Sequence, residues 1–248
     1  MVTTVATGFN GISAQGTLNA GQLKALLAKI ESARKRGRHS AEQVNLVAVT
    51  KAFGPEALIS GFAAGLRLFG ESRVQESATK LPSFPQRKES TIHLIGHLQS
   101  NKVKQAIQLY DTIESVDSLK LLRRIDSLSG QLHKVMPVYL QLNLTGDAGR
   151  FGFAPSEPAK MFPELSAMSH VTISGVMMVA PHTQDEAILR NSFSAAREIR
   201  DALMKTLPGC RALSMGMSGD FEIAIEEGAT HVRVGRLLFG SRPDLPAE

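Results

Sequence analysis

The sequence contains no tryptophan and only two tyrosines, Tyr110 and Tyr139. Proteins that bind single-stranded nucleic acids stack the bases on aromatic side chains, so this composition makes such a surface hard to build. The densest basic cluster, residues 34–38, follows an apolar helical pattern and includes Gly37. Basic side chains and a glycine are typical of the carboxyl end of a helix. We therefore interpret the cluster as a solvated helix end and expect no nucleic-acid partner.

Cysteine is represented by Cys210 alone, so the chain can form no internal disulfide and has no cysteine pair spaced for a metal ion. Long apolar runs are also missing, since no stretch approaches the ~20 residues that span a bilayer. Residues 1–16 lack the basic region and apolar stretch of a secretion signal. Hydrophobic residues make up 43% and charged residues 21% of the chain, as in soluble globular proteins. We expect a cytoplasmic protein that does not bind membranes.

Short apolar segments alternate with helical patterns along most of the chain. Eight such units without a break in composition favour a single closed parallel (β/α)8 barrel, because open doubly wound sheets usually stop at about five or six strands. We expect one domain over residues 1–248, with residues 1–19 as an irregular extension. The predicted strands are 45–50, 66–69, 91–95, 112–116, 136–142, 171–178, 211–215 and 230–234. The predicted helices are 18–36, 55–64, 72–80, 99–109, 117–128, 156–168, 184–206 and 219–227.

The first predicted strand is a β-branched apolar run that leads directly to Lys51, after which Phe53-Gly54-Pro55 breaks the pattern. Such a run is typical of a strand buried on both faces. In a parallel barrel the carboxyl ends of the strands face the active-site mouth, where a partly desolvated lysine amine can form a Schiff base. The alternative, from this segment alone, is a solvated lysine at a strand end.

Two glycine-bearing turns, at residues 213–220 and 231–236, follow the last two predicted strands. Barrels of this kind often hold a phosphate there, because small residues let backbone N–H groups approach the anion. Ser214 or Ser218 would add a hydroxyl donor. Alternatively, the glycines only form turns and Ser218 caps a helix.

Glu71 and His93 lie near the ends of the second and third predicted strands and are candidates for lining the same cavity. Each also has an ordinary structural use, since a glutamate complements a helix start and a histidine inside a strand forms core hydrogen bonds.

Closure of a barrel places its last strand beside its first. Lys51 and the turns within residues 213–236 are then expected to meet at one mouth. An amine that forms an imine beside a phosphate site suits a ligand that carries both an aldehyde and a phosphate. Pyridoxal phosphate (PLP) and the sugar phosphate of a Schiff-base aldolase are the two candidates.

Five separated motifs lie at or near these strand ends. They are VAVTK (47–51), FGESRVQE (69–76), HLIGHLQSNK (93–102), SGVMMVAP (174–181) and LSMGMSGDFEIAIEEGATHVRVGRLLFG (213–240). In this order they resemble the pyridoxal-phosphate homeostasis protein family, single-barrel relatives of the alanine racemase N-terminal domain, over about residues 44–242. The resemblance implies fold type III of PLP-binding proteins.

The resemblance also implies roles for single residues. Lys51 matches the residue that holds PLP as a Schiff base, and Arg233 matches the position facing the pyridine nitrogen. Ser214, Gly235 and Arg236 match the positions that bind the phosphate.

Four residues depart from the usual pattern of this family. Ser72 stands where asparagine is common and Arg236 where threonine is common, while Asp147 and Arg150 replace the frequent glutamate and lysine. Arg236 changes the side-chain part of the phosphate contact, although its backbone N–H still serves and a guanidinium suits an anion.

A guanidinium at the pyridine nitrogen argues for a cofactor holder rather than a catalyst. Arg233 stays protonated and gives no proton to the ring, and a neutral ring stabilises carbanions poorly. The related racemases use a second base on an added β domain, whereas this chain ends at Glu248, so we expect an open cofactor face. We expect a monomeric, non-enzymatic protein of vitamin B6 and amino-acid homeostasis, with apo forms of PLP enzymes as partners.

Two rival functions stay open. The first is an amino-acid racemase that uses Tyr110, Tyr139 or a histidine as its second base. The second is a Schiff-base aldolase, which would be colourless, whereas a PLP holder would be yellow.

Overall fold

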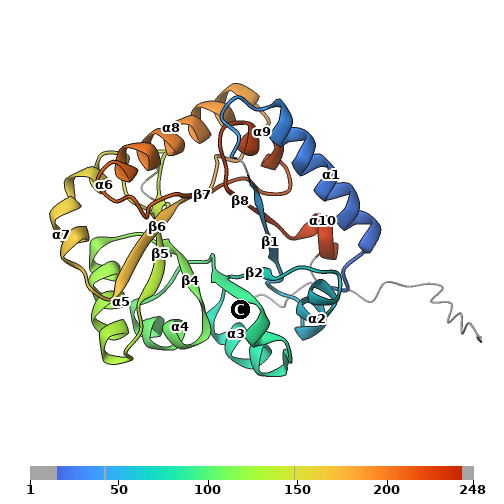
Figure 1. The fold of residues 1–248 in the computed structure, drawn as a ribbon, viewed down its shortest axis with the longest axis horizontal. Helices are drawn as coiled ribbons and strands as arrows, with labels where there is room; N and C mark the ends of the chain where they lie inside the picture. Colours follow the sequence, from blue (N-terminus) through green and yellow to red (C-terminus); the bar gives the residue numbers. More distant parts are fainter. Residues whose placement is uncertain (1–15, 42, 148, 242–248) are drawn as a thin grey trace, which may run out of the picture.

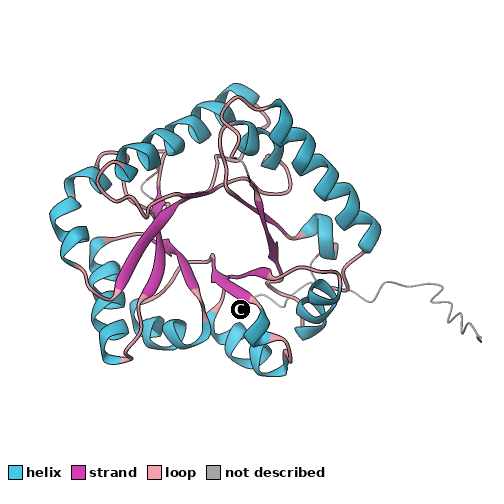
Figure 2. Ribbon diagram, in the orientation of Figure 1, coloured by secondary structure: helices cyan, strands magenta, loops and turns pink. Residues whose placement is uncertain are grey.

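The structure is a computed structural model that describes residues 16–41, 43–147 and 149–241. Over these residues, eight parallel strands close into a barrel in chain order, from β1 to β8. Figures 1 and 2 show the strands as an inner ring with the helices packed around the outside. The closed (β/α)8 barrel predicted from the sequence is confirmed. The irregular extension predicted for residues 1–19 lies, as far as residue 15, outside the described residues.

The elements alternate as the sequence predicts. The strands are β1 Asn45–Val49, β2 Leu68–Glu71, β3 Thr91–Leu94, β4 Thr112–Val116, β5 Met136–Leu142, β6 Val171–Met178, β7 Ala212–Ser214 and β8 His231–Val234. The helices are α1 Ala20–Arg36, α2 Pro55–Ala63, α3 Val74–Lys80, α4 Val103–Leu109, α5 Leu119–Gln131, α6 Glu157–Lys160, α7 Phe162–Ala167, α8 Glu186–Met204, α9 Phe221–Glu226 and α10 Arg236–Phe239. None of the described helices has both the length and the apolar character needed to cross a bilayer.

Three differences from the predicted elements have local causes. The helix predicted over residues 156–168 is two short helices, α6 and α7, because Pro163 has no N–H and its ring interrupts the helical backbone. The second strand extends to Glu71, beyond the predicted 66–69, and the carboxyl group of Glu71 has a buried partner described below. The sequence did not predict α10, a single short helix that begins directly after Gly235.

The ends of the chain close the fold in both layers. In the inner layer β1 pairs with β8 in parallel, with Val47 opposite Arg233 and Ala48 opposite Val234. In the outer layer α1, drawn in blue, lies beside α9 and α10, drawn in red (Figure 1). Asn19 caps the start of α1, because its Oδ1 accepts the N–H of Gln22 at 3.1 Å and so satisfies a backbone donor of the first helical turn.

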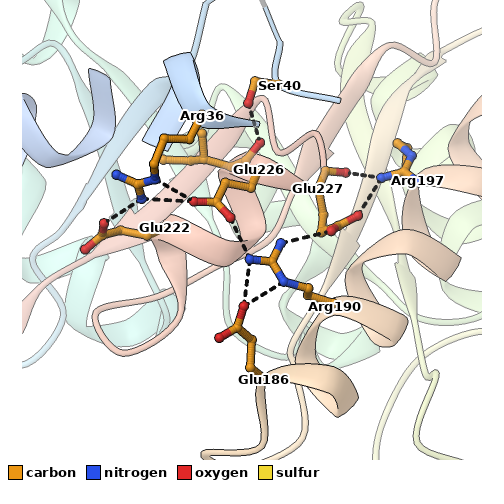
Figure 3. Close-up of polar contacts among 9 residues, drawn as sticks. Arg36, Ser40, Glu186, Arg190, Arg197, Glu222, Glu226 and Glu227 are labelled. Carbon is orange, nitrogen blue, oxygen red and sulfur yellow. Dashed lines mark hydrogen bonds and ion pairs between the residues drawn. The ribbon is translucent and has the colours of Figure 1, made fainter. Parts of the chain in front are cut away.

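An ion-pair network joins α1, α8 and α9 on the outside of the barrel (Figure 3). At its centre, Arg190 of α8 donates to Glu226 at 2.6 Å and to Glu227 at 3.1 Å, at the end of α9. Arg36 of α1 reaches the same Glu226 at 2.9 Å. The network consists of Arg36, Glu186, Arg190, Arg197, Glu222, Glu226 and Glu227. It ties the first helix to the last part of the chain, across the point where the barrel closes.

Replacing Arg190 tests this network. We expect Arg190→Ala to lower the free energy of unfolding by about 1 to 2 kcal/mol, because one guanidinium serves three carboxylates, two of them largely buried. The loss is expected to shrink at high salt, which screens charges. The control is Arg123→Ala, since Arg123 reaches Glu164 only at 3.9 Å on an exposed surface. Chemical denaturation measures both, and equal effects would contradict a special role for Arg190.

Candidate functional site

A cleft of about 880 Å³ opens at the carboxyl ends of the strands. Lys51, just beyond the end of β1, lines it together with Arg233, Gly235 and Arg236 from the end of β8. Lys51 itself is half-buried. Closure of the barrel thus brings together four of the five residues that the sequence analysis selected, from the beginning and the end of the chain.

Gly235 sets how closely the two strand ends approach. A Cβ atom on Gly235 would lie 2.9 Å from the carbonyl oxygen of Val49 and 3.3 Å from its Cβ. Backbone oxygen cannot move aside as a flexible side chain would, so a larger residue would push β8 away from β1. Because glycine has no side chain, the Lys51 segment can lie next to the start of α10.

The loop between β7 and α9 forms another wall of the cleft, with residues 217–220. Asp220 shapes this loop, because its Oδ1 accepts the N–H of Met217 at 2.6 Å. Gly216 holds a left-handed φ of +89°, and a Cβ there would meet the Cβ of Ala224 at 2.6 Å. The half-buried Ser218 lines the cleft and offers a hydroxyl donor to an anion.

Ser214, the fifth selected residue, is fully buried beside Arg233. Its Oγ accepts a hydrogen bond from Arg233 at 2.7 Å and donates its own proton to Oε2 of Glu114 at 2.6 Å. The hydroxyl is therefore engaged inside the barrel. A phosphate contact by Ser214 stays a prediction, and Ser218 is the alternative serine that borders the cleft.

Arg233 is held by a buried polar network. Its second amino group donates to the carbonyl oxygen of Met178 at 2.8 Å, which fixes the plane of the guanidinium. Burial raises the pKa of Glu114, but the hydrogen bond and charge of His93, the charge of Arg233 and the hydrogen bond from Ser214 outweigh it and lower the pKa to about 2. Glu114 is thus a carboxylate that balances the buried guanidinium. Because a carboxylate only accepts, Nδ1 of His93 carries the proton in its 2.6 Å contact with Glu114.

Glu71 and His93, which the sequence suggested as cavity-lining candidates, have core roles instead. Both are buried, Glu71 at 2.7 Å from Nζ of Lys80 and His93 against Glu114. For His93 this is the core hydrogen bonding that the sequence analysis gave as its structural use.

Some site residues escaped the sequence analysis. Glu114 was missed, although one carboxylate in the middle of the apolar strand β4 was a signal for a buried partner. His182 and Thr183 also line the cleft, as does Arg150, which the sequence showed only as a departure from the family pattern. The barrel topology could have identified these residues, because the loops after strands five and six open at the same mouth as the other strand ends.

Comparisons with known proteins agree with this architecture. The model of the family described as "Alanine racemase, N-terminal domain" matches residues 22–243. The pyridoxal phosphate homeostasis protein of Vibrio cholerae is 32% identical over 220 residues, covering 88% of this chain and 93% of its own. The structure of PipY from Synechococcus elongatus PCC7942 with PLP bound superposes with a TM-score of 0.79 at 37% identity, covering 89% of this chain and 99% of that one.

An alanine racemase of Clostridium difficile shares the fold at 17% identity, with a TM-score of 0.73, covering 92% of this chain and 58% of the racemase. Fold and mouth together define an eight-stranded parallel barrel with a lysine side chain and glycine-bearing turns at one opening. The chain belongs to the alanine racemase N-terminal domain family and, within it, to the pyridoxal phosphate homeostasis proteins.

The interior network predicts a pH dependence of stability through His231. Burial lowers the pKa of His231 from near 6.5 to about 4, with His93 and Arg233 adding to the effect and Glu114 opposing it. The unfolded chain therefore takes up a proton as the pH falls below 6.5 while the folded protein does not, so stability is lost from there down to about pH 4.

We expect the wild-type protein to lose about 1 to 2 kcal/mol more stability between pH 7 and pH 5 than His231→Gln does. Denaturant titrations at the two pH values measure the difference. The control is His39→Gln, which removes an exposed imidazole and is expected to keep the wild-type slope. An unchanged slope in His231→Gln would show that His231 titrates normally in the folded protein.

Proposed function

We propose that this protein binds PLP in the cleft at the barrel mouth and acts in intracellular PLP and amino-acid homeostasis without a robust catalytic cycle. The observation that carries the proposal is the meeting of the half-buried Lys51 with the turns at residues 217–220 and 235–236 around one cleft. A relative at 37% identity, PipY, has been solved with PLP bound, which supports the same ligand here.

The residues at the cleft fit the chemical groups of PLP. The Nζ of Lys51 suits the aldehyde carbon, forming the C=N bond of a Schiff base while the aldehyde oxygen leaves as water. The close approach permitted by Gly235, the Ser218 hydroxyl and the Arg236 guanidinium suit the phosphate. Ser214 remains a proposed phosphate contact, although its hydroxyl bonds Glu114 in this structure. Arg233 supplies a donor for the pyridine nitrogen.

The network behind Arg233 favours holding over catalysis. When bound, PLP supplies a ring that withdraws electrons, and it does so best when its nitrogen is protonated. The Ser214 hydroxyl links the two groups: it accepts a hydrogen bond from Arg233 and donates one to the Glu114 carboxylate. The carbonyl oxygen of Met178 accepts a second hydrogen bond from the same guanidinium. These contacts stabilise a charged arginine, which donates a hydrogen bond to the nitrogen without transferring a proton.

The two tyrosines support a non-catalytic role. The hydroxyl of Tyr110 donates to Oγ of Ser77 at 2.6 Å, and Tyr139 packs between the rings of His93 and His231. Burial raises the pKa of both phenols, which disfavours the ionised form that a racemase needs as its second base. We further propose a cytoplasmic, monomeric, single-domain protein over residues 1–248 that exchanges PLP with apo enzymes.

The Lys51→Ala variant tests the proposal directly. Mixing the wild-type protein with PLP is expected to give a yellow adduct, and borohydride reduction is expected to fix the cofactor on Lys51, as read by mass spectrometry of peptides. Lys51→Ala is expected to lose the absorbance band and the label, whereas Lys104→Ala, an exposed lysine on α4, keeps both. A colourless wild-type protein that borohydride links to a sugar phosphate would establish the aldolase instead. Interconversion of alanine enantiomers, lost in Lys51→Ala, would establish the racemase.

Arg236 has a separate test that uses the phosphate itself. Arg236→Ala is expected to weaken PLP binding by about three- to tenfold at low salt, because an exposed guanidinium adds a modest charge-assisted contact. Binding of pyridoxal, which has the aldehyde but no phosphate, is expected to stay unchanged. Titrations followed by absorbance measure both ligands, and an equal loss for the two would assign Arg236 a role outside phosphate binding.

A further inference from the structure

The turn that carries Lys51 adopts a conformation that its sequence does not favour. Ala52, the next residue, has φ +66°, in the left-handed region that residues with a Cβ rarely adopt. The only other described non-glycine residue with positive φ is His133, on the loop after α5. Such a conformation persists only where surrounding contacts hold it, and such residues cluster at functional sites.

Besides its own backbone hydrogen bond from the N–H of Phe53 to the carbonyl oxygen of Thr50, at 3.2 Å, the turn is held by one buried lysine on α3. Nζ of Lys80 lies 2.9 Å from the carbonyl oxygen of Thr50 and 2.9 Å from that of Phe53, which are the residues on either side of Lys51 and Ala52. The side chain of Lys80 is only 4% exposed. A protonated amine has three donors, so these two carbonyls take most of its capacity.

Two carboxylates complete the arrangement. Oε1 of Glu76 accepts the N–H of Ala52 at 2.7 Å and lies 3.2 Å from Nζ of Lys80. Oε1 of Glu71 lies 2.7 Å from the same Nζ and accepts the hydroxyl proton of Thr50 at 2.6 Å. The carbonyls of Thr50 and Phe53 and the N–H of Ala52, on both sides of the Lys51 side chain, are thus bonded to groups of α3.

The members of this cluster, Lys80, Glu71 and Glu76, interact through opposite charges at short distances. Lys80 lies against both Glu71 and the half-buried Glu76. Burial raises the pKa of Glu71, and the charge and hydrogen bond of Lys80 and the hydrogen bond of Thr50 oppose that rise. Removing Lys80 would leave Glu71 buried without a cation among the described residues. It would also take the Lys80 donor from both carbonyls of the turn and leave that of Thr50 with only the N–H of Phe53. A change at residue 80 is therefore transmitted to the backbone of Lys51 although the two side chains belong to different elements.

We propose that Lys80 is a positioning residue for Lys51, which fixes the left-handed turn so that the Lys51 amine faces the anion-accepting turns of the cleft. This inference rests on the proposed function, since the step it assists is Schiff-base formation. In that step the Lys51 nitrogen bonds to the aldehyde carbon and water leaves. Lys80 makes no contact with the ligand in this role and acts only through the backbone of residues 50–53.

The test separates amine placement from general binding by using two ligands. PLP reports capture by the amine, and pyridoxine phosphate, which has an alcohol in place of the aldehyde, reports the noncovalent site alone. Lys80→Met keeps most of the length of the side chain but removes its charge and donors. We expect this variant to form the Schiff base with PLP about tenfold to 100-fold more slowly, because misplacement of a reacting group by about 1 Å has effects of that size. Its affinity for pyridoxine phosphate is expected to change by less than about twofold.

A merely structural role for Lys80 would weaken both ligands together, and that outcome would overturn the proposal, as would wild-type capture rates in Lys80→Met. Lys104→Met, on the exposed face of α4, is the control and is expected to match the wild-type protein with both ligands. Failure of the wild-type protein to capture PLP would contradict the proposed function itself and is distinct from these outcomes.

Glu76→Ala keeps the proposal testable if Lys80→Met does not fold. Glu76 is 23% exposed on its side chain, and its removal frees the Ala52 N–H while leaving Lys80 paired with Glu71. We expect about a threefold to tenfold slower capture of PLP with unchanged affinity for pyridoxine phosphate. Unfolding measured by circular dichroism confirms that the variant is folded, and wild-type capture by a folded Glu76→Ala would overturn the proposal.

Discussion

The pairing of β1 with β8 is the constraint on which the candidate site depends. Its register sets Ala48 opposite Val234, so Lys51 and Arg236 leave the barrel wall at the same level. The space is so tight at this seam that Gly235 has no room for a side chain against Val49. Outside the barrel, α1 packs against α9 and α10 and shares ion pairs with α9. Two layers of contacts thus keep the seam closed, and the cleft exists only while it is closed.

Two buried charge clusters flank the cleft and act on different parts of it. Lys80, with Glu71 and Glu76, holds the backbone around Lys51, while Glu114 holds Arg233 through Ser214. A buried charge is tolerated only with an opposite charge and full hydrogen bonding, since desolvation otherwise outweighs its interactions. Each cluster supplies the opposite charge from its own members, although Oε2 of Glu71 has no hydrogen-bond partner among the described residues, so the cleft-facing groups stay oriented without a ligand. Such prior order lowers the entropy lost on binding.

The sequence predicted those parts of the site that depend on local pattern and topology. The strand pattern led to Lys51 and to the glycine-bearing turn at residues 231–236, because strand ends in a barrel share one mouth, and the family resemblance then selected Gly235 within that turn. The role of Lys80 was not predictable, because a lysine at a helix end is ordinarily solvated and nothing local reveals that it reaches two carbonyls of another element. Ser214 and Ser218 were indistinguishable for a related reason. Ser214 ends β7 and Ser218 lies four residues later in the loop that follows. What separates them is that the Ser214 hydroxyl meets Glu114, one hundred residues away in the chain, while Ser218 borders the cleft.

The two clusters have separate roles, and this separation explains why such a site would bind a cofactor without catalysing a reaction on it. A Schiff base reverses by addition of water, so the lifetime of the adduct depends on how well the amine is placed and on the noncovalent hold on the phosphate. Neither factor requires an activated ring. In the proposed complex, the charge of Glu114 opposes the effect of burial on the pKa of Arg233, so the guanidinium would donate a hydrogen bond to the ring nitrogen without supplying the proton that makes the ring an effective electron sink. Lys80, in the role proposed for it, would assist capture through the backbone of residues 50–53 and not through the ring. A site built in this way gains affinity and exchange with little gain in carbanion chemistry, and the opposite choice at the ring nitrogen, a carboxylate in place of Arg233, would reverse that balance.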